Sequence, residues 1–145
     1  MNKNEILRMA QTILDDVKTA VLATTDKDGT ARMRWMTPVF LKDYPYTLFA
    51  VTSPAFAKVI HIQNQPVAEW MIQTVSLDKI INLRGTLSVI DNPALKNEVM
   101  ESVAKRLHTF WKINPDTDFI IIETVIREAT LFLPVKPHKE TVRFE

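Results

Sequence analysis

Residues 78–89 alternate more strictly between apolar and polar side chains than any other stretch of the chain. Successive side chains of a β-strand point to opposite faces of the sheet, so this alternation predicts a strand that places one face on a core. Its apolar side chains are Ile81, Leu83, Leu87 and Val89, and its polar ones are Asn82, Arg84, Thr86 and Ser88. Gly85 falls on the apolar face, which indicates a β-bulge or a close approach of another backbone.

Other segments rich in β-forming residues predict further strands. They lie at residues 19–25, 30–41, 47–51, 67–73, 119–126 and 129–133. The pair Asp28–Gly29 signals a hairpin, a tight turn is expected at Arg127–Glu128, and Pro38 indicates that pairing on one side breaks at an edge or a bulge. Hairpins follow one another without a β-α-β rhythm. We therefore expect a mainly β (α+β) fold, a barrel of about six antiparallel strands with peripheral helices.

Helices are expected at residues 3–18, at 54–64 and from residue 93 onward. The first has apolar residues at helical spacing, and Asn2 followed by Glu5 resembles a capping box at its start. Residues 134–145 show no clear period, so we expect an extended tail there. A length of 145 residues is typical of one domain, which we assign to residues 1–145.

The composition excludes several kinds of site. The chain has no cysteine, which excludes disulfides, cysteine-ligated zinc and thiol catalysis. It has only two glycines, which excludes a glycine-rich phosphate loop and a dinucleotide-binding fingerprint. The net charge of +1 gives no argument for binding nucleic acid or a membrane.

The N-terminus has no apolar signal core, and no apolar run approaches the roughly 18 residues of a membrane span. We therefore expect a soluble cytoplasmic protein.

The strand expected from residue 30 carries the first candidate for a ligand site. One face of this strand would carry Arg32, Arg34 and Met36, and the other would carry Met33, Trp35 and Thr37. The two arginines then start about 6.6 Å apart on the same side. This spacing suits two guanidinium groups that converge on one phosphate.

The second candidate follows the strand at residues 47–51. Thr52-Ser53-Pro54 resembles an N-cap serine with proline at the first helical position. A helix N-terminus offers free N–H groups and a favourable dipole to an anion, and Lys58 can add its ammonium. Each feature alone is common on a solvated strand or at an ordinary cap. Together, around one strand–turn–strand–helix unit, they predict a cradle for a phosphate-bearing cofactor.

Several short motifs occur in a characteristic order and spacing. They are Val21-Leu-Ala-Thr24, Asp28-Gly29-Thr-Ala-Arg32-Met-Arg34-Trp35-Met36, Leu48-Phe-Ala-Val51-Thr52-Ser53, Lys58-Val59, Asn64-Gln-Pro66-Val67-Ala68 and Leu83-Arg-Gly85-Thr-Leu. As a set they resemble the pyridoxamine 5′-phosphate oxidase-related family, in its short, general-stress-protein-like branch. The resemblance covers roughly residues 5–133. It implies a flavin-binding split barrel and a homodimer with two FMN sites at the subunit interface.

The resemblance also implies roles for individual residues. Arg32 and Lys58 would bind the FMN phosphate, with Thr52 and Ser53 assisting. Residues 34–37 would lie along the isoalloxazine and supply backbone contacts, and Trp111 lies where the second subunit often covers the flavin. The implied cofactor-binding residues are Arg32, Arg34, Trp35, Met36, Thr37, Val51, Thr52, Ser53, Lys58 and Trp111.

The resemblance implies an FMN-dependent oxidoreductase whose substrate and electron donor are not identified. The chain departs from full-length oxidases at Ala57, at Ile80 and in residues 134–145, so flavin binding is better supported than oxidation of pyridoxamine phosphate. No catalytic acid or base can be named. Two alternatives stay open, a flavin-binding stress or sensor protein without turnover, and a split barrel that binds deazaflavin or haem. The three histidines, His61, His108 and His138, have no metal-ligand spacing.

Overall fold

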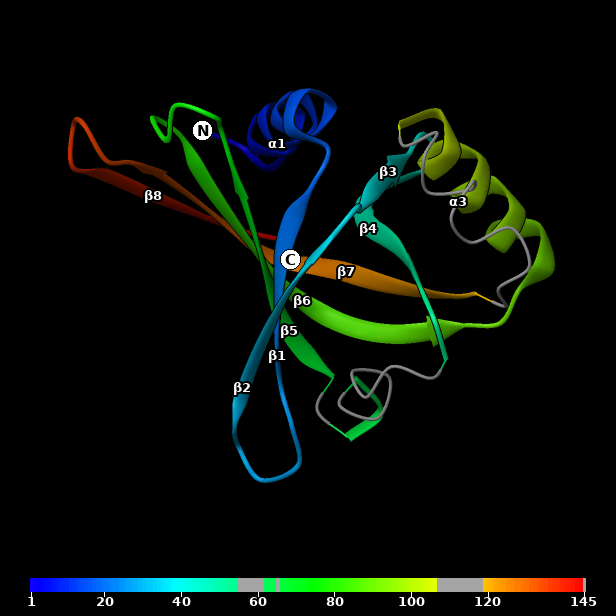
Figure 1. The fold of residues 1–145 in the computed structure, drawn as a ribbon. Coiled ribbons are helices and arrows are strands. Elements are labelled where there is room, and N and C mark those ends of the chain that lie inside the picture. Colours follow the sequence, from blue (N-terminus) through cyan, green and yellow to red (C-terminus); the bar gives the residue numbers. More distant parts are fainter. Residues whose placement is uncertain (55–61, 65, 107–118, 145) are drawn as a thin grey trace.

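The computed structural model describes residues 1–54, 62–64, 66–106 and 119–144. Figure 1 shows a strongly curled sheet against which helices α1 and α3 pack. The helices are α1 (Lys3–Val17) and α3 (Pro93–Arg106), and the strands are β1 (Ala20–Thr25), β2 (Ala31–Met36), β3 (Val39–Leu41), β4 (Tyr44–Thr52), β5 (Val67–Gln73), β6 (Ile80–Ile90), β7 (Ile120–Leu133) and β8 (His138–Arg143). Within these ranges, no helix has the length and apolar character needed to cross a membrane.

The order of the strands requires the sheet to close on itself. They follow the order β2-β1-β5-β6-β7-β4-β3, and β8 pairs with β7. The strands β2 and β3 lie at opposite ends of this order, yet only Thr37 and Pro38 separate them in the sequence. Met36 and Val39 can therefore lie at most about 11 Å apart, which brings the two ends of the sheet together. The result is the curled, antiparallel split barrel with a few helices that the sequence predicted, although the described residues form eight strands instead of about six.

The helix α1 and the concave side of the sheet form the main hydrophobic core. The helix begins as expected, because the Asn2 side chain accepts a hydrogen bond from the Glu5 N–H at 2.9 Å. Its buried residues are Ile6, Leu7, Ala10, Ile13 and Leu14. They join Trp70, which is fully buried on β5. The Trp70 indole N–H donates to the Thr124 hydroxyl on β7 at 2.9 Å, so the ring also ties two strands together through a buried hydrogen bond.

The helix α3 covers the other side of the sheet. Val99 and Val103 on α3 are buried against Phe49 of β4 and Ile121 of β7 in a second hydrophobic cluster. This placement agrees with Figure 1, where α3 lies beside β3 and β4, away from α1. The strands β4 and β7 are therefore covered on both faces, and their positions are well determined by packing.

Two strand boundaries differ from the sequence analysis. The strand expected over residues 30–41 breaks at Thr37–Pro38 into β2 and β3, which confirms the interruption indicated by Pro38. The tight turn expected at Arg127–Glu128 is wrong, because β7 continues through these residues as one strand. Glu128 pairs with Arg84 and Ile126 pairs with Gly85, so Arg127 forms a bulge in the ladder. Its carbonyl accepts a hydrogen bond from the Phe144 N–H at 2.9 Å.

The tail also contains a strand that the sequence analysis did not identify. Residues 138–143 form β8, which pairs with β7 from Leu133↔His138 to Glu128↔Arg143. Its side chains are exposed or half-buried and largely polar. For this reason the segment has no apolar alternation to mark it as a strand.

Gly85 lies where the sequence analysis expected a bulge or a close backbone approach, and the structure shows both. A Cβ built at this position would overlap the Val125 carbonyl oxygen and lie 2.8 Å from a methyl carbon of Thr124. The neighbouring strand β7 can therefore approach β6 only if residue 85 has no side chain. Gly29 differs, because its φ of +87° needs glycine although nothing lies near its Cβ position.

We expect the Gly85→Ala substitution to destabilise the fold by about 1–3 kcal/mol, because the added methyl group would force two strands of the barrel apart. Gly29→Ala is the matched control, with a cost of about 1 kcal/mol that comes from backbone strain alone. Urea unfolding of both variants measures the difference. A Gly85→Ala variant that is no less stable than Gly29→Ala would contradict this packing.

Candidate functional site

The strand β2 has the two faces that the sequence predicted. Arg32, Arg34 and Met36 pair with Thr24, Leu22 and Ala20 of β1, three residues whose side chains are buried. Met33 and Trp35 lie on the opposite face, and 74% and 64% of their surfaces are exposed. The two arginines therefore share the barrel side of β2, and the large apolar side chains point away from it.

Arg34 is held within the barrel wall. It is half-buried, and its Nη1 donates to the Thr24 hydroxyl at 2.7 Å and to the Leu22 carbonyl at 3.3 Å. Burial lowers the pKa of this guanidinium from its ordinary value, because the charged form loses hydration. In the described part of the chain, no carboxylate lies within 4.0 Å of Arg34. Arg34 thus contributes a partly desolvated positive charge with no acidic partner among those residues.

Arg32 is held in place by a carboxylate that the sequence analysis missed. The Arg32 Nε donates to Asp26 Oδ2 at 3.2 Å, and Asp26 is almost fully buried. The other oxygen of Asp26 accepts from the N–H groups of Asp28 and Thr30, at 3.3 and 3.0 Å. Asp26 therefore closes the β1–β2 turn and fixes one edge of the Arg32 guanidinium. The Nη groups of Arg32 remain on a side chain that is 56% exposed.

The candidate residues on β4 lie at the end of that strand. Val51 and Ser53 are half-buried, and Thr52 is buried with 3% of its surface exposed. The Thr52 hydroxyl oxygen is buried and has no hydrogen-bond partner among the residues that the structure describes. A buried hydroxyl without a partner costs free energy, so this group is a candidate for contact with a ligand.

Some of the residues implied by the resemblance cannot be placed. Lys58 and Trp111 lie outside the described residues, as do His61 and His108. Of the helix expected at residues 54–64, the structure describes Pro54, which lies in a turn, and residues 62–64, which are helical. The described candidate residues therefore lie in two places, on the arginine face of β2 with the Asp26 turn and at the end of β4.

The backbone of β2 offers further contacts. This strand ends the sheet order and pairs only with β1 among the described strands. About half of its N–H and C=O groups therefore face away from β1 and need other partners. Met36 is buried and Thr37 is half-buried at the point where β2 leads into β3. An extended backbone edge beside two arginines can bind a flat ligand through its main-chain groups.

Residues 7–128 match the family model described as pyridoxamine 5′-phosphate oxidase. The chain belongs to the pyridoxamine 5′-phosphate oxidase family. The matched region includes the arginine face of β2, the Asp26 turn and the end of β4, and it agrees closely with the extent of the resemblance in the sequence. A search of curated proteins gave no match.

Solved structures share the fold at low sequence identity. One is a protein related to general stress protein 26 of B. subtilis, from Clostridium acetobutylicum, with a TM-score of 0.77 and 10% identity over 98% of this chain and 96% of that one. A haem-binding protein from Mycobacterium smegmatis has a TM-score of 0.76 and 14% identity over 95% and 57% of the two chains. A pyridoxamine 5′-phosphate oxidase-related, FMN-binding protein from Nostoc punctiforme has a TM-score of 0.65 and 14% identity over 97% and 96%.

We expect the two functions of Asp26 to separate by substitution. Asp26→Asn keeps an oxygen that can accept from the turn but loses the ion pair with Arg32, so it should cost at most about 1 kcal/mol. Asp26→Ala also leaves the two turn N–H groups without their acceptor and should cost about 1–3 kcal/mol. Thermal unfolding of the two variants measures this order. Equal stability of both variants would show that Asp26 does not hold the turn.

Proposed function

We propose that this chain binds FMN and is an FMN-dependent oxidoreductase. The observation that carries the proposal is the positive charge of Arg34, which is partly desolvated in the barrel wall without a carboxylate beside it in the described part of the chain. Such a charge is costly to bury unless an anion compensates it. A phosphate at this face of β2 would supply that compensation.

The described residues fit a phosphate-bearing cofactor in three ways. Arg32 uses Nε for Asp26, and its exposed Nη groups remain to donate to phosphate oxygens. The buried Thr52 hydroxyl has no partner in the described part of the chain, which matches its proposed role in assisting the phosphate together with Ser53. Lys58 is the second cation that the family pattern assigns to this group. Arg34 would act mainly through its fixed charge, since Thr24 and Leu22 already accept from its Nη1.

The free edge of β2 is the proposed contact for the flavin ring. Residues 34–37 lie at the end of this strand, where main-chain N–H and C=O groups face away from β1. The pyrimidine edge of a flavin presents both acceptors and a donor, which an extended backbone can bind. The protein would thereby orient the ring without committing titratable side chains to it.

When bound, FMN supplies hydride and electron transfer, and the protein's part is to bind and orient it and to tune its electrostatics. We propose no described side chain as a catalytic acid or base. Reduction of the bound flavin by NADH or NADPH and its reoxidation by an added acceptor distinguish an oxidoreductase from a flavin-binding stress or sensor protein.

Haem is the second candidate ligand, supported by the haem-binding protein from Mycobacterium smegmatis that shares this fold. A haem iron needs an axial ligand from the protein. His138, the histidine within the described residues, is exposed on β8 beside Glu140. The features that favour a phosphate, Arg32, Arg34 and Thr52, lie on other strands. We therefore favour FMN.

Arg32→Ala should weaken FMN binding about 10- to 100-fold, the loss expected when charge-assisted hydrogen bonds to a phosphate are removed. The matched control is Arg143→Ala, because Arg143 is an exposed arginine on β8, 3.9 Å from Glu128. Each variant is titrated with FMN, and the quenching of flavin fluorescence on binding gives the affinity. Unchanged affinity in Arg32→Ala would show that Arg32 does not bind the phosphate.

We also propose a homodimer, formed through the outer face of β2, β1 and β5. Trp35 is 64% exposed and lies in one cross-strand row with Val21 and Met71. Met33, in the next row, is 74% exposed. Large apolar side chains gathered on one sheet face indicate a protein interface. A second copy of the chain covering this face would place the free edge of β2 beside the subunit boundary, where the family pattern locates the flavin.

We expect Trp35→Glu to convert the dimer to a monomer, because a buried, unpaired carboxylate would oppose association. Val135→Glu is the control, since Val135 is 82% exposed in the turn between β7 and β8, away from this face. Sedimentation equilibrium of the two variants measures the mass. A Trp35→Glu protein that stays dimeric would exclude this face as the interface.

A further inference from the structure

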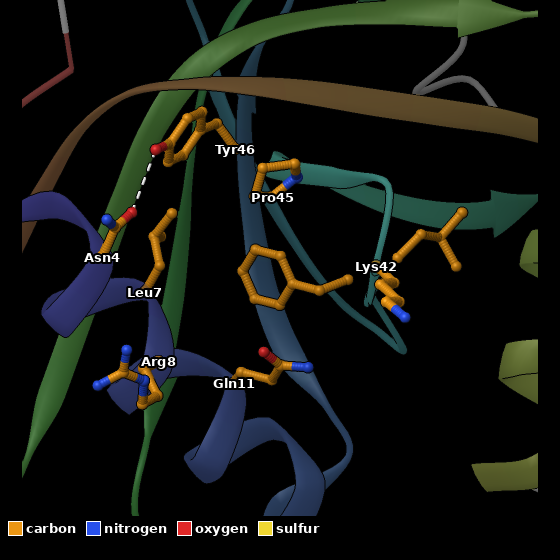
Figure 2. A pocket seen from close by; sticks show the side chains of 9 residues that line it. Asn4, Leu7, Arg8, Gln11, Lys42, Pro45 and Tyr46 are labelled. Carbon is orange, nitrogen blue, oxygen red and sulfur yellow. Dashed lines mark hydrogen bonds between the residues drawn. The ribbon is translucent and has the colours of Figure 1, made fainter.

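A pocket of about 420 Å³ lies between α1 and the β3–β4 hairpin, apart from the proposed flavin site. Figure 2 shows its labelled side chains, which come from one face of α1 and from the hairpin. The lining residues are Asn4, Leu7, Arg8, Gln11, Phe40, Leu41, Lys42, Pro45 and Tyr46. Its volume falls within the range of small-molecule binding sites in proteins.

The wall formed by Tyr46 is held in a fixed position. Its hydroxyl donates to Asn4 Oδ1 at 3.1 Å, the contact drawn as a dashed line in Figure 2. The Lys3 ammonium lies 4.7 Å from the centre of the ring, and the Phe144 ring packs edge-on with a centroid distance of 5.9 Å. Leu7 and Leu41 are buried and form further apolar lining. This wall of the pocket is thus preformed, which reduces the entropy cost of binding a ligand.

The charged side chains of the pocket are both cations. Arg8 on α1 and Lys42 in the hairpin lie on opposite sides of it, with Gln11 between them in Figure 2. None of the described residues that line it is acidic. Within the described ranges, no carboxylate lies within 4.0 Å of Arg8 or Lys42. Two cations without acidic partners above an apolar lining favour an anion that carries an apolar body.

The pocket lies far from the end of β4, where the proposed flavin site has Thr52. Tyr46 lies near the start of β4, and Thr52 is the last residue of the same strand. Six residues of an extended strand span about 20 Å. A ligand in this pocket therefore does not contact the end of β4, and none of the described lining residues is a proposed flavin-binding residue.

We propose that this pocket binds a small aromatic carboxylate. The ring would pack on Leu7 and Phe40, and the carboxylate would accept hydrogen bonds from Arg8, Lys42 and Gln11. The aromatic ring matches the apolar lining of the pocket, and the carboxylate matches its two cations. The site serves as a second ligand site of the domain, in addition to the proposed binding of FMN.

The probe is benzoate, added to ¹⁵N-labelled full-length protein and followed by NMR. Benzoate should shift the amide signals of Arg8, Gln11 and Lys42, with and without FMN present, and more weakly as salt is added. Benzamide has nearly the same shape without the charge and should bind at least threefold more weakly. Equal shifts from benzoate and benzamide, or shifts confined to the end of β4, would overturn the proposal.

Substitutions test the individual contacts. Arg8→Gln and Lys42→Gln should each weaken benzoate binding about two- to fivefold, the effect expected for an exposed charge. Lys136→Gln, in the turn between β7 and β8, is the matched control and should leave binding unchanged. Gln11→Trp places a bulky ring at an exposed position of the lining and should abolish the shifts while the fold is kept. Unaltered binding in Arg8→Gln and Gln11→Trp would show that benzoate binds elsewhere.

Discussion

The two residues Thr37 and Pro38 connect the opposite ends of the sheet, and the rest of the structure depends on this short connection. Because Met36 and Val39 cannot lie more than about 11 Å apart, the sheet must curl into a barrel. The concave side is then filled by the apolar face of α1 and by Trp70, whose indole N–H donates a hydrogen bond to the Thr124 hydroxyl. The same connection leaves one edge of β2 unpaired by the other described strands. It thereby creates the free backbone edge proposed to contact the flavin.

Electrostatics distinguishes the two arginines of β2. Asp26 pairs with Arg32 and closes the hairpin turn with the same carboxylate, so this arginine is oriented at little cost. Arg34 is partly desolvated, and its acceptors among the described residues, Thr24 and Leu22, are neutral. A fold selected for stability alone would gain little from such a charge. Groups of this kind are typical of functional sites, where stability is exchanged for binding.

Much of the fold could be predicted from local patterns. The two-residue period of β2 placed Arg32 and Arg34 on one face, and Gly85 marked the close approach of β7. The turn expected at Arg127–Glu128 was wrong, because a polar pair between apolar runs has the same pattern in a turn and in a bulge. The bulge is determined by pairing with β6, which involves residues distant in sequence. The partnership of Asp26 with Arg32 and the pocket beside Tyr46 likewise depend on tertiary packing.

The absorption spectrum of the purified protein, recorded after incubation with FMN and removal of free flavin, tests the central claim most directly. We expect flavin bands that correspond to about one FMN per chain, because each chain supplies the residues of one anion site. Absence of retained flavin at saturating FMN would contradict it. Retention of haem instead, with its own strong absorption band, would show that the domain binds a different cofactor.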